Sequence, residues 1–219
     1  MPVPFSQYFP VWDRLAPHER EMLTSSSVSR KVPAGTLICS GGDNIGVIIV
    51  RSGRLRAYIS SDEGKELTVY RLFEKDLSIL SVADPSDSIG FDIHITAEKN
   101  SEIWIIPTAV YKQLMENSAP LANLTSELLA SALSSIIYAS GRVLWKGIHS
   151  RLARFLLDES ALEGTTRLKL THETIASHLG TAREVVTRTL KDFQDEGLVS
   201  LSRGYVVISD AKGLENKDI

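Results

Sequence analysis

The chain has a single cysteine, Cys39, among its 219 residues. One thiol cannot form an intramolecular disulfide or supply several thiolates to a metal site. Cys39 follows Ile38 in a β-rich run, which favours a small buried side chain over a redox-active thiol. No stretch reaches the roughly 18 uninterrupted apolar residues of a membrane span, and the first residues lack the features of a signal peptide. We therefore expect a cytoplasmic protein without a membrane partner.

The sequence also lacks the basic excess that is common in nucleic-acid-binding proteins, because its formal net charge is −3. The charge is unevenly distributed. Residues 1–141 hold 12 Lys and Arg against 16 Asp and Glu, or −4, whereas residues 142–219 hold 12 against 11, or +1. The C-terminal part is thus the less anionic one, which permits DNA binding without requiring it. The chain is long enough for two globular domains, each with its own core.

Short β-rich runs fill the chain from Lys31 to Pro107, separated by Gly, Asp, Ser and Pro. This pattern is typical of an antiparallel sandwich or barrel. Residues Gly46–Leu72 are predicted to form two hairpins. The first would turn at Ser52-Gly53, because glycine adopts the positive φ that tight turns need. Short helices are predicted before these runs, at about Trp12–Thr24, and after them, at Val110–Met115.

A helix of about 25 residues is predicted from Pro120 to Lys146. Pro120 fits the first turn of a helix, where its missing N–H costs nothing. Apolar and small side chains recur along the helix at spacings of three and four residues, which places them in one stripe. Such a stripe could cover the chain's own domain, but on a long helix joining two domains we expect a dimer interface. The predicted interface residues are Leu129, Leu133, Ile136, Ser140 and Val143.

The C-terminal part is predicted to form three helices closed by a β-hairpin, the plan of a winged helix-turn-helix domain. The charged tail after Ala211 is expected to fray. The predicted elements are a helix at His149–Leu162, a strand at Arg167–Leu170, helices at His172–Leu179 and Ala182–Glu196, and a hairpin at Leu198–Ser209.

The last two of these helices carry the signals of a helix-turn-helix. Thr171 is placed to cap the first helix, and Gly180 fits the tight turn that follows it. Thr181 is expected to cap the second helix and to form a capping box with Glu184, three residues later.

The second helix has one apolar and one polar face. Val186, Leu190 and Phe193 recur at i, i+4 and i+7 and are expected to pack against Ile175 and Leu179. The polar face carries groups that suit DNA: Arg bonds O6 and N7 of guanine, Glu accepts from N4 of cytosine, and Thr contacts the methyl group of thymine. A solvated face with an Arg–Glu surface pair is the alternative, but the turn, the caps and the hairpin favour DNA. The predicted DNA-contacting residues are Arg183, Glu184, Thr187, Arg188 and Lys191 on this face, with Thr181 just before the helix and Arg203 in the hairpin.

The run Gly180-Thr181-Ala182-Arg183-Glu184-Val185-Val186-Thr187-Arg188 resembles the recognition helix of the CRP/FNR superfamily of transcription regulators. Gly42-Asp43, Gly53 and Gly64-Lys65-Glu66 are similar to the jelly-roll sensor of that family, so the resemblance spans nearly the whole chain. It implies an α+β protein with an N-terminal antiparallel β jelly roll of the cyclic-nucleotide-binding type at 1–117. A long dimerisation helix at 118–147 and a winged helix-turn-helix at 148–219 would follow.

The resemblance also implies a function. The chain would be a homodimeric transcription regulator that binds double-stranded palindromic DNA with TGTGA-like half-sites, works with RNA polymerase and responds to a small-molecule effector in the jelly roll. Arg183 and Arg188 would read guanines, Glu184 the cytosine of a G·C pair, and Thr171 would contact a phosphate. Thr187 stands where FNR-type members carry a serine, which leaves the first base of the half-site open. A constitutive DNA-binding regulator with a vestigial sensor is the alternative.

Three effectors are familiar in this family, and each needs characteristic residues in the sequence. Residues from Asp76 to Glu98 include five carboxylates (Asp76, Asp84, Asp87, Asp92 and Glu98) and no Lys or Arg. A buried cyclic nucleotide such as cAMP would find no cationic partner there, so we do not expect one. The lone Cys39 cannot hold the four-cysteine iron–sulfur cluster of oxygen-sensing members. Haem-based CO sensing uses a histidine and an N-terminal proline. Pro2 is present, but Ser81 stands near the histidine position, so haem stays an alternative.

An enzyme is the remaining class to consider, because jelly rolls also host metal-dependent cupin enzymes. Those sites need two or three histidines and a carboxylate inside the barrel, and of the five histidines only His94 lies in the β-rich part. The alternation along its strand places His94 on the polar face, so we interpret it as a surface residue and not a ligand. We predict no catalytic and no metal-binding residues.

Overall fold

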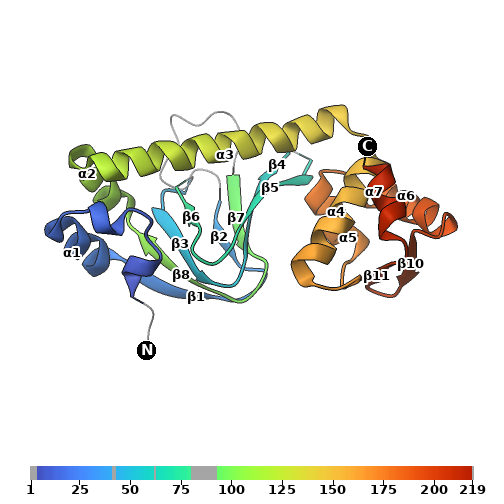
Figure 1. Cartoon of the computed structure of the whole chain (residues 1–219), viewed down its shortest axis with the longest axis horizontal. Coiled ribbons are helices and arrows are strands. Elements are labelled where there is room, and N and C mark those ends of the chain that lie inside the picture. Colours follow the sequence, from blue (N-terminus) through green and yellow to red (C-terminus); the bar gives the residue numbers. More distant parts are fainter. Residues whose placement is uncertain (1–3, 41–42, 62, 80–92, 219) are drawn as a thin grey trace. The chain divides into compact units, whose positions relative to one another are not determined.

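The computed structural model describes residues 4–40, 43–61, 63–79 and 93–218. The chain divides into two compact units, one of residues 1–60 with 69–136 and the other of residues 61–68 with 137–219. The first unit is a β-sandwich with helices beside it, and the second is a small helical domain with a β-hairpin (Figure 1).

Two four-stranded antiparallel sheets form the sandwich of the first unit. Their facing sides bury a shared aliphatic core that includes Ile48, Leu55, Ile95 and Ile103. This confirms the antiparallel β fold that the sequence predicts. One sheet has the order β1 (Val28–Val32), β8 (Ser101–Ile106), β3 (Val47–Ser52) and β6 (Leu77–Ser78). The other has the order β2 (Leu37–Cys39), β7 (Ile93–Ala97), β4 (Leu55–Ser60) and β5 (Glu66–Leu72).

Strand β3 begins with four consecutive buried residues because both of its faces are covered. Ile48 and Val50 belong to the core between the sheets, whereas Val47 and Ile49 belong to a second core shared with the flanking helices. These helices are η1 (Phe5–Gln7), η2 (Trp12–Arg14), α1 (Pro17–Ser26), α2 (Thr108–Asn117) and the first part of α3 (Ala119–Trp145). The sequence pattern predicted a single helix at about Trp12–Thr24. The structure has two, η2 and α1, because Pro17 is the first residue of a new helix.

The prediction of two hairpins between Gly46 and Leu72 is wrong for the first of them. Strands β4 and β5 are hydrogen-bonded neighbours, but β3 pairs with β8 and β6 in the other sheet. Ser52-Gly53 therefore sits where the chain crosses between sheets. Gly53 has a φ of +92°, and a Cβ atom there would collide with the backbone of Asn100, so the glycine serves a close approach of two chain segments.

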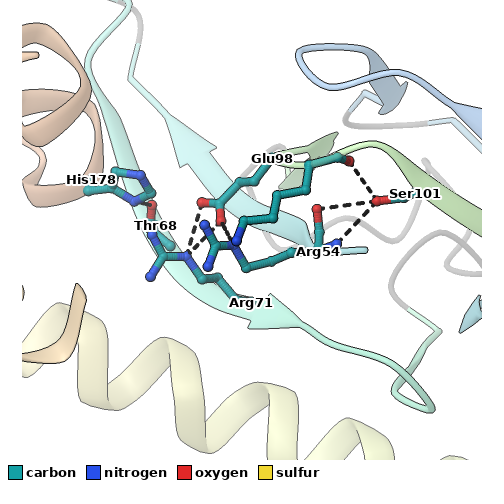
Figure 2. Close-up of polar contacts among 7 residues, drawn as sticks. Arg54, Thr68, Arg71, Glu98, Ser101 and His178 are labelled. Carbon is teal, nitrogen blue, oxygen red and sulfur yellow. Dashed lines mark hydrogen bonds and ion pairs between the residues drawn. The ribbon is translucent and has the colours of Figure 1, made fainter. Parts of the chain in front are cut away.

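Glu98 joins two arginines of the sandwich (Figure 2). Its Oε2 atom lies 2.6 Å from the Nε atom of Arg54 and 3.0 Å from that of Arg71, and all three side chains are largely buried. The nearby Ser101 hydroxyl donates to the backbone carbonyl of Lys99 at 2.8 Å. Charge-assisted hydrogen bonds to the shared carboxylate offset part of the cost of burying the two guanidinium groups in the first unit.

Cys39 and His94 were both considered as possible functional residues in the sequence, and the structure shows what surrounds them. Cys39 is 3% exposed, and burial together with the nearby Asp43 raises the pKa of its thiol to about 11, which matches a small buried side chain. The Nδ1 atom of His94 lies 3.2 Å from the Ser40 hydroxyl, and its Nε2 atom lies 2.9 Å from the Ser60 hydroxyl. Both imidazole nitrogens are thus engaged by serines.

In the second unit, four of the described helices surround one core, and a three-stranded antiparallel sheet of order β10-β11-β9 closes it. The Arg151 guanidinium donates to the carbonyl of Leu179 at 2.7 Å and so fastens α4 to the end of α5. Residues 61–68, which include the start of β5, also belong to this unit, and the Thr68 hydroxyl lies 2.7 Å from Nδ1 of His178 (Figure 2). The elements are α4 (Ile148–Glu163), β9 (Arg167–Leu168), α5 (His172–Leu179), α6 (Arg183–Asp195), β10 (Val199–Ser202), β11 (Tyr205–Ile208) and α7 (Ala211–Lys217).

The expectation that the tail after Ala211 frays is wrong, because this segment forms α7. The Asp210 side chain caps the helix by accepting from the Gly213 N–H at 3.0 Å. Leu214 is fully buried in the core of the second unit, and Lys217 pairs with Glu196 at 2.7 Å. One buried leucine within a charged segment is too weak a periodic signal to predict a helix.

Replacing Leu214 by alanine tests whether α7 is part of the folded domain. Because the side chain is completely buried, Leu214→Ala should lower the free energy of unfolding by about 2–5 kcal/mol in urea denaturation. The neighbouring Glu215 is exposed, so Glu215→Ala is the matched control and should change stability little. Equal stabilities for the two variants would mean that α7 does not pack as described.

Candidate nucleic-acid interface

Helix α5 is fixed at both ends by local hydrogen bonds. The Thr171 hydroxyl accepts from the backbone N–H of Thr174 at 3.0 Å, so Thr171 is the N-cap. Gly180 ends the helix in the left-handed conformation with a φ of +63°, and its N–H bonds the carbonyl of Ala176. These two findings confirm the predicted cap and the predicted turn.

Helix α6 begins one residue later than the sequence suggests. Its N-cap is Ala182, which makes no side-chain cap hydrogen bond, so the predicted Thr181–Glu184 capping box is wrong. The backbone of Ala182 is extended, and the N–H of Thr181 bonds the carbonyl of Ala176 at 3.2 Å. Thr181 therefore belongs to the turn between the helices, and its N–H is bonded to the C-terminal end of α5.

The apolar face of α6 is completely buried. Val186, Leu190 and Phe193 have no exposed surface, and they share one core with Ile175 and Leu179 of α5, as predicted. Because helical side chains follow a 3.6-residue period, burial of this face turns the opposite face outward.

Five of the predicted DNA-contacting residues lie on the outward face of α6. Three are cationic, one is anionic and one is a threonine, so the face carries a net positive charge at neutral pH. Thr171 is also exposed, at the start of α5, whereas Thr181 is partly buried in the turn. The five residues of this face are Arg183, Glu184, Thr187, Arg188 and Lys191, and Gln194 and Asp195 are also exposed near the C-terminal end of α6.

The wing, formed by β10, β11 and their turn, stands beside α5 and α6. Arg203 is exposed in this turn, next to Gly204 with a φ of +77°. An open groove of about 670 Å³ lies between the wing and the helices and is lined by Thr171, His172, Glu173, Arg183 and residues 201–205. Arg167 stacks on the ring of Tyr205 at 4.4 Å to the ring centroid, which adds a cation beside the wing.

Sequence reasoning missed His172 as part of this surface. Its Nδ1 atom lies 2.8 Å from the Thr187 hydroxyl, and this contact links α5 to the outward face of α6. Burial, and then the positive charge of Arg183, hold the pKa of His172 below its ordinary value. Its position directly after the capping residue Thr171 is the one sequence signal that could have pointed to it.

Helix α3 presents a second surface, made of apolar side chains that face solvent. Of the predicted interface residues, Leu129, Leu133 and Val143 are exposed, and Ile136 and Ser140 are partly buried. Four further exposed apolar residues of α3 were missed by the prediction. Ile137 and Leu144 lie beside this row, whereas Tyr138 and Trp145, the last with 84% of its surface exposed, lie on roughly the opposite side of the helix. By length and composition alone, α3 is also the one helix among the described residues that could cross a membrane.

A cavity of about 320 Å³ lies inside the first unit, between the sandwich and α3. Hydroxyl groups line it from both sides, with Tyr70 and Ser78 on the sandwich and Ser131 and Ser135 on α3. Burial raises the pKa of Tyr70 to about 12, so its phenol stays protonated at neutral pH. Arg71 and Lys75 also line the cavity, and both precede the segment from Asp76 to Glu98 that contains no Lys or Arg.

Together, a helix-turn-helix with an outward cationic face, a wing and a separate β-sandwich define a winged helix-turn-helix transcription regulator with a sensor-type domain. The domain model described as a Crp-like helix-turn-helix domain matches residues 150–217. A crystal structure from Eubacterium rectale ATCC 33656, assigned to the crp/fnr family of transcriptional regulators, aligns with a TM-score of 0.92. It is 46% identical in sequence, and the alignment covers 97% of this chain and 99% of that one. The chain belongs to the CRP/FNR family.

Two further proteins show how far the similarity extends. The Cyclic AMP receptor protein of Thermus thermophilus is 26% identical over 208 residues, which cover 94% of this chain and 95% of that protein. The c-di-GMP responsive regulator CLP of Xanthomonas campestris shares the fold, with a TM-score of 0.72 at 21% identity, over 88% of this chain and 99% of that one. The names of these two proteins refer to different small molecules.

Removing the N-cap of α5 should weaken the second unit. Thr171→Ala deletes the hydroxyl that satisfies the Thr174 N–H and should lower the free energy of unfolding by about 1 kcal/mol, measured in urea. Thr171→Ser keeps an equivalent oxygen and should stay close to the wild type. The cap assignment would be contradicted if the serine variant lost as much stability as the alanine variant.

Proposed function

We propose that the protein is a homodimeric regulator that binds palindromic DNA with TGTGA-like half-sites through α6. The proposal rests on one observation, the exposed cationic face of a helix whose opposite face is completely buried. Arg183 and Arg188 each bond O6 and N7 of a guanine, and Glu184 accepts from the N4 amine of a cytosine. Lys191, Thr171, Thr181 and the wing residue Arg203 contact the phosphate backbone around the base-reading residues.

Dimerisation through α3 explains why so much apolar surface of this helix faces solvent. Leu129, Leu133, Ile136, Ser140 and Val143 recur at alternating spacings of four and three residues, the heptad pattern of a two-helix seam. Exposed apolar surface of this extent is costly for a monomer in water. Serines together with Glu127 and Arg142 break the apolar character elsewhere on α3, unlike a membrane helix that is apolar all round. A dimer in the cytoplasm accounts for both features.

A small-molecule effector in the cavity between the sandwich and α3 would couple ligand binding to the dimer helix. Residues 1–117 then act as the sensor, 118–147 as the dimerisation helix and 148–219 as the DNA-binding domain, with RNA polymerase as the further partner. Binding would change the packing of the α3 pair and the separation of the recognition helices, which must match half-sites about 34 Å apart.

Two alternatives to effector control are tested by simple measurements. If the sensor is vestigial, operator affinity will change by less than about ten-fold across a broad panel of metabolites, because no ligand then favours one arrangement of the α3 pair over another. If the protein carries haem, material purified from its own host will show haem absorbance bands. Several residues used above to judge haem and cyclic-nucleotide binding lie outside the described part of the chain. They are Pro2 and Ser81 for haem, and Asp84, Asp87 and Asp92 for the cyclic nucleotide.

Substitutions on the reading face should separate base reading from phosphate binding. Arg183→Ala should weaken binding to a TGTGA operator by about 1–3 kcal/mol and relax the preference for one guanine, because a bidentate base contact is lost. Lys191→Ala should weaken binding to all sequences alike and reduce the slope of log K against log salt by about 1. Fluorescence anisotropy with variant operators at several salt concentrations measures both.

The two variants control for each other, because both remove one positive charge from the same helix. If Arg183→Ala weakened all sequences equally, without relaxing any base preference, α6 would not be the base-reading element.

A charge in the centre of the α3 row should separate the protomers. Leu133→Glu places a carboxylate in the proposed seam and should convert the dimer to a monomer with loss of operator binding, measured by sedimentation velocity and anisotropy. Ser134→Glu adds the same charge at the adjacent exposed position, about 100° around the helix, and should leave the dimer intact. A Leu133→Glu protein that stays dimeric and binds its operator normally would refute the seam.

A further inference from the structure

The Thr187 hydroxyl is engaged within the protein, although its side chain lies on the reading face. It donates to the carbonyl of Arg183, one turn earlier, at 3.0 Å. It also lies 2.8 Å from Nδ1 of His172. A hydroxyl has one hydrogen, so with that hydrogen on the Arg183 carbonyl, the imidazole must be the donor in the second contact. The hydroxyl hydrogen is therefore not available to an acceptor on a base.

His172 is well placed to hold this arrangement. It is the first residue of α5, next to the capped Thr171, so its backbone is fixed by the N-cap. Its ring is partly buried, and its pKa is lowered by burial and by Arg183, which favours the neutral imidazole with a single hydrogen. With that hydrogen on Nδ1, the ring approaches Thr187 as a donor.

The two hydrogen bonds fix the rotamer of Thr187. Threonine is stiff at χ1, and its oxygen is drawn toward the backbone of α6 and toward α5. The γ-methyl carbon is the remaining heavy atom of this side chain. A methyl group on a recognition helix suits one feature of the major groove, the 5-methyl group of thymine.

We propose that His172 is a positioning residue for base reading: by holding the Thr187 hydroxyl it presents the γ-methyl group to the DNA, and this selects thymine at the base pair that Thr187 faces. The inference rests on the proposed DNA-binding function and adds to it a residue outside the reading helix. It also assigns the half-site base that the resemblance left open.

Deoxyuridine provides the test, because it differs from thymidine only by the 5-methyl group. Each thymine of a TGTGA inverted-repeat operator is replaced in turn, and the ratio of the two affinities is measured for each protein. For the wild type, one position should show a loss of about four-fold, as expected for one buried methyl group. Thr187→Val keeps a methyl group and should keep this ratio, whereas Thr187→Ser should bring it to near one.

Two variants of His172 test its positioning role. His172→Asn keeps a side-chain N–H donor and should retain the thymine preference, whereas His172→Phe keeps a ring without the donor and should reduce the ratio to less than about two-fold. Because each ratio compares two duplexes with the same protein sample, partial loss of folded protein cancels. The preference for guanine at the Arg183 position should be unchanged in all four variants.

The outcomes distinguish failure of this inference from failure of the proposed DNA-binding function. Wild-type binding with a ratio near one at every thymine, or a ratio unchanged in His172→Phe or in Thr187→Ser, overturns the inference while the proposed function stands. Absence of wild-type binding to any such operator overturns both.

Discussion

The burial of one face of α6 against α5 is the constraint on which the second unit depends. Val186, Leu190 and Phe193 are fully inaccessible, and the helical period then leaves only one orientation for Arg183 and its exposed neighbours. The Thr171 cap and the left-handed Gly180 fix the length and direction of α5. For the proposed DNA binding, a face that is set by packing and by backbone hydrogen bonds needs little reordering, which reduces the entropic cost of association.

The same physical argument applies to α3 with the opposite result. Leu121 and Leu124 are buried in the first unit, but Leu129, Leu133 and Val143 of the row that follows stay exposed. A folded chain that retains a long apolar stripe on a helix points to a partner helix with the same stripe, which a two-fold dimer supplies. Two recognition helices at a fixed separation are also what a palindromic site requires. The apolar stripe and the cationic face thus support the same assembly.

Local signals made parts of the structure predictable. The bounds of α5 follow from a capping threonine and a glycine, and the buried face of α6 follows from simple periodicity. The predicted start of α6 is wrong by one residue. Thr181 is a good capping residue in isolation, but in the structure it belongs to the turn that ends α5, where its N–H bonds the Ala176 carbonyl. The crossing at Ser52-Gly53 looked like a hairpin because a glycine needed for close backbone approach and a glycine needed for a tight turn leave the same sequence signal. The contact between His172 and Thr187 joins residues 15 positions apart and depends on the angle between two helices, which no local pattern encodes.

The central claim is that two copies of α6 read an inverted repeat. Selection of bound sequences from a random pool of double-stranded DNA by the purified full-length protein tests it most directly. The account predicts enrichment of two TGTGA-like half-sites in inverted orientation, with centres about one helical turn or 34 Å apart. No enrichment, or enrichment of a single half-site or of direct repeats, would contradict it.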